Sequence, residues 1–406
     1  MGIDEVRFGI RNIVRRPARA GLTLAAIALG VASLVLSGGF VEDILYQLRE
    51  ATIRSQLGHL QIYKQGQFAS GGHRPFDFLI DDGDAVRRAV ASLPGLVTQG
   101  QRISFSGVIS NGKGELPILG EGVEPDAESR IGSAFTILSG RQLTAGDTSG
   151  MVIGEGLANA MKLKVGDTAN VVLSTREGAA NTLDFRIVGV LRSLSKEFDA
   201  RAVRIPLAAA QELTASTGVN AVVVLLADTR QTERARMELA AKLPPGLEVK
   251  TWQELADFYN STAALYERQF GFLQVIILVM VLLSVANSVN MTLQERTQEF
   301  GIMRALGRTG RDVFRIAVLE TAILGVSGAV LGVALGVVVA LMVSAIGIPM
   351  APPPNSESGF VAGVQVVPGV VGAAFVAGLV ASVIAALLPA RYISRLQVVE
   401  ALRRGI

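Results

Sequence analysis

The chain has 406 residues, of which 50% are hydrophobic and 18% are charged, and its formal net charge is +3. About a quarter of the residues in a typical soluble protein are charged, so this balance indicates a membrane protein. No cluster of Lys and Arg interleaved with aromatic residues occurs, which excludes a typical nucleic-acid-binding surface. The absence of cysteine excludes disulfide frameworks, thiolate metal sites and cysteine nucleophiles.

The N-terminal segment, residues 1–19, combines an apolar stripe with arginines on another helical face, which predicts a helix lying in the membrane interface. Residues 20–41 then form an uncharged run of the length that crosses a hydrocarbon layer of about 30 Å. A cleaved signal peptide has a shorter apolar region of about 7–15 residues and a small-residue cleavage site. We therefore expect an uncleaved first transmembrane helix.

Residues 42–268 carry charges every few positions and short apolar stretches separated by turn residues, which predicts a folded α+β domain outside the membrane. Its two ends, 42–57 and 251–272, have helical spacing and are expected to be stems that continue the flanking spans. The predicted strands are 59–64, 105–110, 115–121, 168–173, 183–191 and 220–227. The predicted helices are 84–93, 154–163, 207–216 and 231–243.

The stretch GVISNGKG, residues 107–114, superficially matches a phosphate-binding loop. The residue after its lysine is Gly114, where the motif needs Ser or Thr to reach Mg²⁺, and an extended run with Pro117 follows instead of a helix. Asn111 and Gly112 are predicted to form a type I′ hairpin turn, in which both central residues have positive φ. We expect no cofactor in this chain, and ATP with Mg²⁺ only in a partner.

His59 and His73 are the only histidines, and without cysteines they complete no four-ligand zinc site unless carboxylates join them. We expect both histidines on the surface or in loops, and we predict no metal site. No G-x-S-x-G nucleophile elbow occurs. No catalytic residue is therefore predicted, and the chain is expected not to be an enzyme.

The C-terminal half contains three more apolar runs and one Pro-rich loop. The apolar runs are 269–293, 318–346 and 364–388, and the loop is 347–363. The loop has no Lys or Arg, whereas 1–19, 294–315 and the tail 389–406 are rich in arginine. Basic residues near span ends remain in the cytoplasm, which places these three segments and both termini there. The expected fold class is an α-helical membrane protein with four transmembrane helices and a large α+β extracytoplasmic domain inserted between the first and second.

Two sets of residues inside the predicted spans have open interpretations. Gly328, Gly332 and Gly336 recur every four residues, so they mark a close helix contact, either within one subunit or between two copies. The second span carries polar residues, which either line a substrate path or bond a neighbouring helix. These polar residues are Ser284, Asn287, Ser288 and Asn290.

The segment 294–315 is a charged island between two apolar runs. If it is helical, Phe300, Met303 and Leu306 lie near one another at positions i, i+3 and i+6. One interpretation is a basic turn on anionic lipid, and the other is a docking helix for a partner protein. The residue pattern by itself favours neither.

The island contains the pattern E-R-x-x-E-x-G-x-x-R-A-L-G, which resembles the cytoplasmic signature of the FtsX-like ABC transporter permeases. This family includes MacB-type exporters and the lipoprotein-releasing LolC and LolE subunits. The segments NIVRRPARAGLT, 12–23, and PARYISRLQVVEALR, 389–403, resemble the start and end of the family pattern. Residues 55–68 resemble the lipoprotein-releasing branch in particular.

The resemblance implies a permease subunit of a bacterial cytoplasmic (inner) membrane that binds a separate cytoplasmic ABC ATPase and a second permease copy or paralogue. ATP hydrolysis in the partner would drive mechanotransmission through the stems and extract or export a lipoprotein, lipid or other amphipathic substrate, with a periplasmic adaptor as a further partner. The alternatives are export of a drug or peptide, or a regulator of an extracytoplasmic cell-wall hydrolase. No substrate-binding residue is predicted. The implied ATPase-coupling residues are Glu295, Arg296, Glu299, Phe300, Gly301, Met303, Arg304, Leu306 and Gly307.

Overall fold

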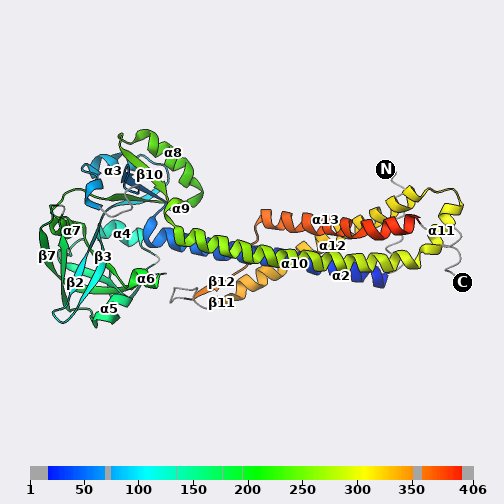
Figure 1. Cartoon of the computed structure of the whole chain (residues 1–406), viewed down its shortest axis with the longest axis horizontal. Coiled ribbons are helices and arrows are strands. Elements are labelled where there is room, and N and C mark those ends of the chain that lie inside the picture. The colour runs from blue at the N-terminus through cyan, green and yellow to red at the C-terminus, as the bar shows by residue number, and fades with distance from the viewer. Residues whose placement is uncertain are drawn as a thin grey trace. The chain divides into compact units, whose positions relative to one another are not determined.

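The structure is a computed structural model that describes residues 17–68, 75–133, 135–175, 177–193, 195–350 and 359–395. The predicted interfacial helix before Pro17, the second histidine His73 and the tail after Arg395 lie outside the described residues. The chain forms two compact units (Figure 1). The helical unit comprises residues 1–46, 263–349 and 361–406, and the sheet unit comprises residues 47–262 and 350–360.

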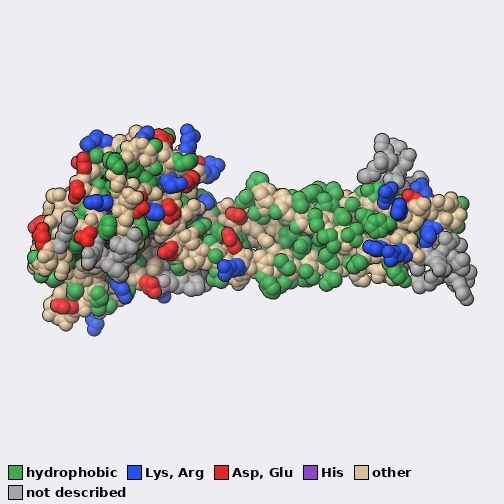
Figure 2. Space-filling view, turned by 45° about the horizontal axis from the view of Figure 1, so that its top comes forward, with side chains coloured by type: hydrophobic (Ala, Val, Ile, Leu, Met, Phe, Trp, Pro, Cys, Tyr) green, Lys and Arg blue, Asp and Glu red, His purple; other side chains and the backbone are tan. Residues whose placement is uncertain are grey.

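Four long helices dominate the helical unit, and each is long and apolar enough to cross a membrane. They are α2 (Pro17–Thr52), α10 (Asp257–Glu295), α12 (Gly310–Ile346) and α13 (Pro368–Arg395). Hydrophobic side chains cover the surface of this unit, and Lys and Arg side chains gather at the end that carries α11 (Thr297–Ala305) (Figure 2). The four expected apolar helices are confirmed, while their passage through a membrane stays a prediction.

The glycine stripe of α12 packs against α2 of the same chain. A Cβ atom added at Gly332 would lie 2.6 Å from the carbonyl oxygen of Ala28, and one added at Gly336 would lie 3.0 Å from the Cβ of Val35. Gly328 makes an equally close approach to the same helix. Only glycine permits this helix separation, so the structure supports the interpretation of the stripe as packing within one subunit.

The segment that leads into α13 is fastened to α2. The backbone N–H of Gly363 donates to Oδ2 of Asp43 over 2.7 Å, and the N–H of Gln365 donates to the carbonyl oxygen of Gly39 over 3.0 Å. Asp43 is 9% exposed, and its carboxylate also accepts a hydrogen bond from the side-chain amide of Gln365, so both oxygens of this buried group have partners. A short two-stranded sheet precedes this segment, with β11 at Ile348–Met350 and β12 at Phe360–Ala362.

The sheet unit is built on a ten-stranded mixed sheet in the order β10-β1-β9-β2-β3-β8-β5-β7-β4, with β6 paired to β2 and β7. Its strands are β1 (Leu60–Lys64), β2 (Leu96–Ser110), β3 (Glu115–Val123), β4 (Thr136–Gly140), β5 (Gly150–Gly154), β6 (Thr168–Ser174), β7 (Ala180–Arg192), β8 (Ala202–Pro206), β9 (Ala221–Leu226) and β10 (Leu247–Thr251). Its helices include α3 (Gly83–Ala91), α4 (Pro125–Ile131), α5 (Glu155–Met161), α6 (Lys196–Asp199), α7 (Leu207–Thr214), α8 (Thr232–Lys242) and α9 (Trp252–Leu255). A π-helical turn, η1 (Ile53–Leu57), follows α2, and two 3₁₀ turns lie at η2 (Pro75–Phe78) and η3 (Thr229–Gln231).

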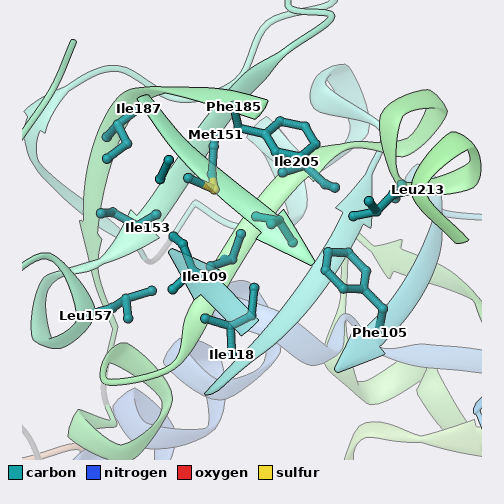
Figure 3. Close-up of a cluster of buried hydrophobic side chains, with 14 of the residues drawn as sticks. Phe105, Ile109, Ile118, Met151, Ile153, Leu157, Phe185, Ile187, Ile205 and Leu213 are labelled. Carbon is teal, nitrogen blue, oxygen red and sulfur yellow. The ribbon is translucent and has the colours of Figure 1, made fainter. Parts of the chain in front are cut away.

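The main core of the sheet unit lies between the strands and the helices that cover them (Figure 3). Phe105 of β2, Ile153 of β5 and Phe185 of β7 are each at most 2% exposed and meet in this core. All six predicted strands and all four predicted helices are present, and their ends agree within a few residues except that β2 begins at Leu96, nine residues before the predicted start. The strands that the sequence did not predict include β5 and β8, which are buried throughout, so their residues do not alternate in polarity. Each pairs in parallel with one neighbour, and the two pair antiparallel with each other.

The turn at residues 111–114 is a hairpin, as predicted, but its geometry differs from the prediction. Strand pairing ends at Ser110 and Glu115, so four residues form the loop. Gly112 has a φ of +76°, whereas Asn111 is not among the residues with positive φ. Oδ1 of Asn111 accepts hydrogen bonds from the N–H groups of Lys113 and Gly114, so this side chain replaces the expected second left-handed residue.

His59 lies in the short loop between η1 and β1, as one of the two expected placements has it, but it is 1% exposed, so a surface position is excluded. Its Nδ1 accepts a hydrogen bond from the N–H of Leu226, which leaves Nε2 to donate to Oγ1 of Thr229 over 3.0 Å. Oγ1 of Thr229 in turn donates to Oε1 of Glu50 over 2.9 Å. Burial lowers the pKa of His59 to about 4, because the charged imidazolium would lose its hydration.

A buried ion cluster joins three strands to helix α4 in the sheet unit. Arg102 donates to both carboxylate oxygens of Glu128, and Nη1 of Arg204 donates to Oε1 of the same residue over 2.7 Å. Arg204 also bonds Glu121, and its guanidinium lies 4.4 Å from the ring centre of Phe135. Every charge in this cluster has a partner, so the cluster fixes the positions of the strands and leaves no charge for a ligand.

Candidate functional site

The charged island folds as a short helix between two long ones. Helix α10 ends at Glu295, α11 spans Thr297–Ala305, and α12 begins at Gly310. Gly307 has a φ of +96°, a conformation that suits only glycine at low cost. Its N–H donates to the carbonyl of Arg304 and the N–H of Arg308 donates to the carbonyl of Met303, which is the Schellman termination of a helix.

Helix α12 starts immediately afterwards with a capping box. Oγ1 of Thr309 accepts a hydrogen bond from the N–H of Asp312, and Oδ2 of Asp312 accepts one from the N–H of Thr309 over 2.9 Å. These reciprocal bonds satisfy donors that a helix start leaves unpaired. The LGRTGRD segment therefore stops one helix and begins the next within five residues, which fixes the direction in which α11 leaves the bundle.

Arg296 anchors this turn from inside the helical unit. It is 4% exposed and lies between α10 and α11. Its Nη1 donates to Oε2 of Glu320 on α12 over 2.6 Å, and its Nε donates to Oε2 of Glu299 over 2.9 Å. The guanidinium also lies 5.0 Å from the ring centre of Phe300. A buried cation needs such partners, so Arg296 joins three helices rather than facing a partner protein.

The predicted apolar face of α11 is divided between the core and the exterior. Phe300 is 2% exposed and packs in the core of the helical unit with Leu293 and Val313, and half-buried Met303 packs against the same core. Gly301 is buried as well. Leu306 is 82% exposed. Of the three residues that the helical spacing places near one another, Phe300, Met303 and Leu306, only Leu306 is exposed and available to a partner.

The exposed side of α11 consists of other residues. Ile302 is 47% exposed and lies one helical turn before Leu306, and both are flanked by the exposed residues Glu299 and Arg308. Arg304 is half-buried and Glu295 is exposed at the end of α10. We call the surface formed by Glu299, Ile302, Leu306 and Arg308 the α11 ridge.

The sequence pattern did not identify Ile302 of the α11 ridge or Glu320, the buried partner of Arg296. Glu320 stands at the start of an otherwise uncharged apolar run, and an acid at such a position requires a partner. That requirement was a usable signal, although it did not identify Arg296. The capping box at Thr309 and Asp312 was also visible in the sequence as a Thr-x-x-Asp pattern before an apolar run.

Some polar residues of the second span form hydrogen bonds within the helical unit, and others are exposed. Oγ of Ser288 is hydrogen-bonded to Oγ1 of Thr23 on α2, which agrees with bonding between neighbouring helices. Oδ1 of Asn290 accepts a bond from Gln294 on its own helix. Ser284 and Asn287 are exposed on α10.

The described residues contain no group of three or more acidic residues or histidines that could hold a metal ion.

Two family models match the chain. The MacB-like periplasmic core domain matches residues 20–242, and the FtsX-like permease C-terminal domain matches residues 271–398. The second match includes α11, α12 and the anchor formed by Arg296 and Glu320.

Curated relatives extend over most of the chain. The lipoprotein-releasing system transmembrane protein LolE of Haemophilus influenzae is 24% identical over 74% of this chain and 76% of that protein. The corresponding LolC of Xylella fastidiosa is 23% identical over 94% of this chain and 92% of that protein. The macrolide export ATP-binding/permease protein MacB of Bdellovibrio bacteriovorus is 24% identical over 84% of this chain and 54% of that protein. The chain belongs to the FtsX-like family of ABC transporter permeases, of the MacB, LolC and LolE type.

Proposed function

We propose that this chain is the membrane subunit of an ABC transporter in a bacterial inner membrane, and that a separate cytoplasmic ATPase docks on the α11 ridge. The observation that carries the proposal is the division of α11 into an anchored and an exposed side. Ile302 and Leu306 lie one turn apart, with an acid and a base beside them. An apolar pair with charges of both signs suits a protein groove, whereas an anionic lipid surface suits a uniformly basic face.

The anchor would convert movement of the ATPase into movement of two long helices. Arg296 bonds Glu320 on α12 and stands directly after the last residue of α10, so a force on α11 reaches both. Helix α10 is continuous for 39 residues, which at about 1.5 Å per residue is on the order of 60 Å. Displacement of α10 is the mechanotransmission step of this proposal, and ATP with Mg²⁺ belongs to the partner.

The proposed substrate is a lipoprotein, a lipid or another amphipathic molecule. LolE and LolC belong to lipoprotein-releasing systems and align with this chain over most of their lengths, which supports lipoprotein release. MacB is a macrolide export protein, which supports the alternative of export of a drug or peptide. A regulator of an external cell-wall hydrolase, and a periplasmic adaptor as a further partner, remain predictions from the family resemblance.

A second permease copy or paralogue is a further part of the proposal. The glycine stripe is occupied by α2, so the contact with another copy has to use a different surface. Helix α10 offers one, since Met280, Leu283 and Asn287 are exposed and recur at intervals of three and four residues, with Asn287 polar among apolar neighbours. An asparagine on such a seam favours pairing with an identical helix. The chain has no cysteine, so this contact can be tested by introducing one. A disulfide between two copies of the Leu283→Cys variant would support the contact. Val338→Cys is the control, because Val338 is also exposed but lies on α12, and it should form no disulfide.

Docking of the ATPase is tested by measuring its affinity for the purified full chain in nanodiscs. Leu306→Ser is expected to weaken binding about thirtyfold, the effect of losing one central apolar contact. Leu388→Ser is the matched control, because Leu388 is 81% exposed in α13 and lies outside the ridge. Equal affinities for Leu306→Ser and the unchanged chain would contradict docking at α11.

The transport step is tested separately in proteoliposomes that contain the chain, its ATPase and a fluorescent diacylated peptide. ATP-dependent release of the peptide to an external acceptor is the expected result. An active, coupled ATPase that releases no acylated peptide but moves a macrolide or a short peptide would assign the chain to drug or peptide export. An active ATPase with none of these transported species would favour the regulator.

A further inference from the structure

A cavity of about 600 Å³ opens between α2, α10 and α13 within the helical unit. Several small residues line it. Gly271 of α10 and Gly369 of α13 face open space, since a Cβ atom added to either would have no heavy atom within 4 Å. Ala373, one helical turn after Gly369, is also exposed in this cavity. Larger side chains at these positions would fill the space.

The remaining wall of the cavity is largely apolar. Leu34 and Val41 come from α2, Phe270 and Leu278 from α10, and Val370 from α13. These side chains provide a surface for an aliphatic or acyl chain, and the volume lies within the range of about 300–1,000 Å³ that is typical of small-molecule sites.

Two carboxylates stand at the edge of this apolar cavity. Glu42 of α2 and Glu267 of α10 both line it and both are exposed. Neither has a hydrogen bond or an ion pair within the part of the chain that the structure describes. The amide of Gln274 supplies a further polar group.

Neighbouring charges do not cancel this pair. Asp43 is turned toward the N–H of Gly363, and Arg268, which follows Glu267, is absent from the cavity lining. The start of α13 at Pro368 contributes roughly half a positive charge through the helix dipole, against two negative charges. The cavity therefore combines an apolar interior with a net negative edge.

We propose that this cavity binds an amphipathic cation, a molecule with an aliphatic tail and an amine or quaternary ammonium head. The tail occupies the apolar wall, and the head lies beside Glu42 and Glu267. An anionic head of the same size is repelled by the same carboxylates. The inference rests on the proposed transport function and narrows its substrate class from amphipathic molecules in general to those with a cationic head.

The binding test uses the full chain in nanodiscs of zwitterionic lipid, without ATPase or nucleotide. The probes are a fluorescent twelve-carbon chain with a trimethylammonium head and the same chain with a sulfonate head. The unchanged chain is expected to bind the cation about tenfold more tightly than the sulfonate. The double variant Glu42→Gln/Glu267→Gln should bind the cation about tenfold more weakly than the unchanged chain does. Its affinity for the sulfonate should stay the same or increase. Raising the salt concentration should reduce the preference in the unchanged chain.

The role of the cavity itself is tested by filling it. Ala373→Trp should weaken binding of both probes, whereas Val380→Trp, at an exposed position of α13 outside the cavity, should weaken neither. Equal affinities for the two heads, or cation binding that is insensitive to the double glutamine variant, would overturn the proposal. A disulfide between two copies of Ala373→Cys would overturn it as well, because the cavity would then be a contact between subunits.

These outcomes are separable from failure of the proposed function. The binding measurement needs no ATPase, so Leu306→Ser should leave the preference for the cation unchanged. Loss of selectivity with intact ATPase docking would refute only the cationic substrate class. Loss of docking with intact selectivity would refute only the role of the α11 ridge.

Discussion

Replacing Arg296 with methionine is expected to loosen the end of the helical unit that carries α11. Methionine retains most of the apolar stem but removes the guanidinium that bonds Glu320, whose side chain is 13% exposed. Removing one partner of a buried ion pair costs about 3–5 kcal/mol. The bond to Glu299 adds little, because the side chain of Glu299 is 55% exposed. We expect about 3 kcal/mol, the lower end of the range, since the side chain of Glu320 keeps some exposure to its surroundings.

The loss is measurable as a rate of thiol labelling, because the chain has no cysteine of its own. Ala317 is 2% exposed and lies one turn before Glu320 on α12, so Ala317→Cys reports local opening of this region. A change of 3 kcal/mol corresponds to a labelling rate about a hundredfold higher when opening and closing are fast. Arg308→Met is the matched control and should change the rate less than about twofold, since Arg308 is exposed.

A double-mutant cycle decides whether the ion pair is responsible. Glu320→Met alone leaves the Arg296 cation buried without its nearest carboxylate and should also accelerate labelling. The double variant Arg296→Met/Glu320→Met removes both charges, so its labelling should be slower than that of either single variant. Additive effects of the two substitutions, or a rate for Arg296→Met within twofold of the parent, would refute the reasoning.

Three further predictions concern other parts of the chain. Gly332→Val should destabilise the helical unit by about 1–3 kcal/mol, because an added Cβ atom would lie 2.6 Å from the α2 backbone. Gly372 faces open space, so Gly372→Val should leave the stability unchanged. The two variants are compared by the temperature at which the solubilised chain loses its monodisperse elution peak. Gly307→Ala should cost about 1 kcal/mol through its φ of +96°, and it should accelerate labelling of the α12 reporter about fivefold. The free energy of unfolding of the sheet unit should have its full value above pH 6.5 and fall by up to about 3 kcal/mol as the pH approaches 4. As the pH falls, His59 takes up a proton in the unfolded chain before it does so in the folded chain, where its pKa is about 4. Urea unfolding followed by Trp252, the sole tryptophan, measures this fall, and a slope that is equally steep in His59→Gln would contradict its origin.

The long elements of this protein are recoverable from local patterns. Uncharged runs of about 20 residues predict helices that need no tertiary context. Helices α2, α10 and α12 contain the first three predicted spans, and α13 begins four residues after the predicted start of the fourth. Six strands were also found, including the uniformly apolar β9, whereas the five-residue buried strands β5 and β8 were missed. The island at 294–315 was visible because its charge density contrasts with its surroundings.

The orientation of each side chain depended on long-range packing. Spacing placed Phe300 and Leu306 on one face of a short helix, but the structure buries the first and exposes the second. The exit angle of α11, set by Gly307 and by the bond from Arg296 to a carboxylate 24 residues away, decides which side meets the core.

The same limit applies to the glycine stripe of α12 and to His59. The sequence determined that α12 has a face fit for close approach, and the tertiary structure decided that α2 occupies it. A histidine before a strand looks like a surface residue until Leu226 of β9 and Thr229 of η3 complete its hydrogen bonds. Hydrophobic burial is non-directional, so periodicity specifies that a face must be covered, and only the packed chain specifies what covers it.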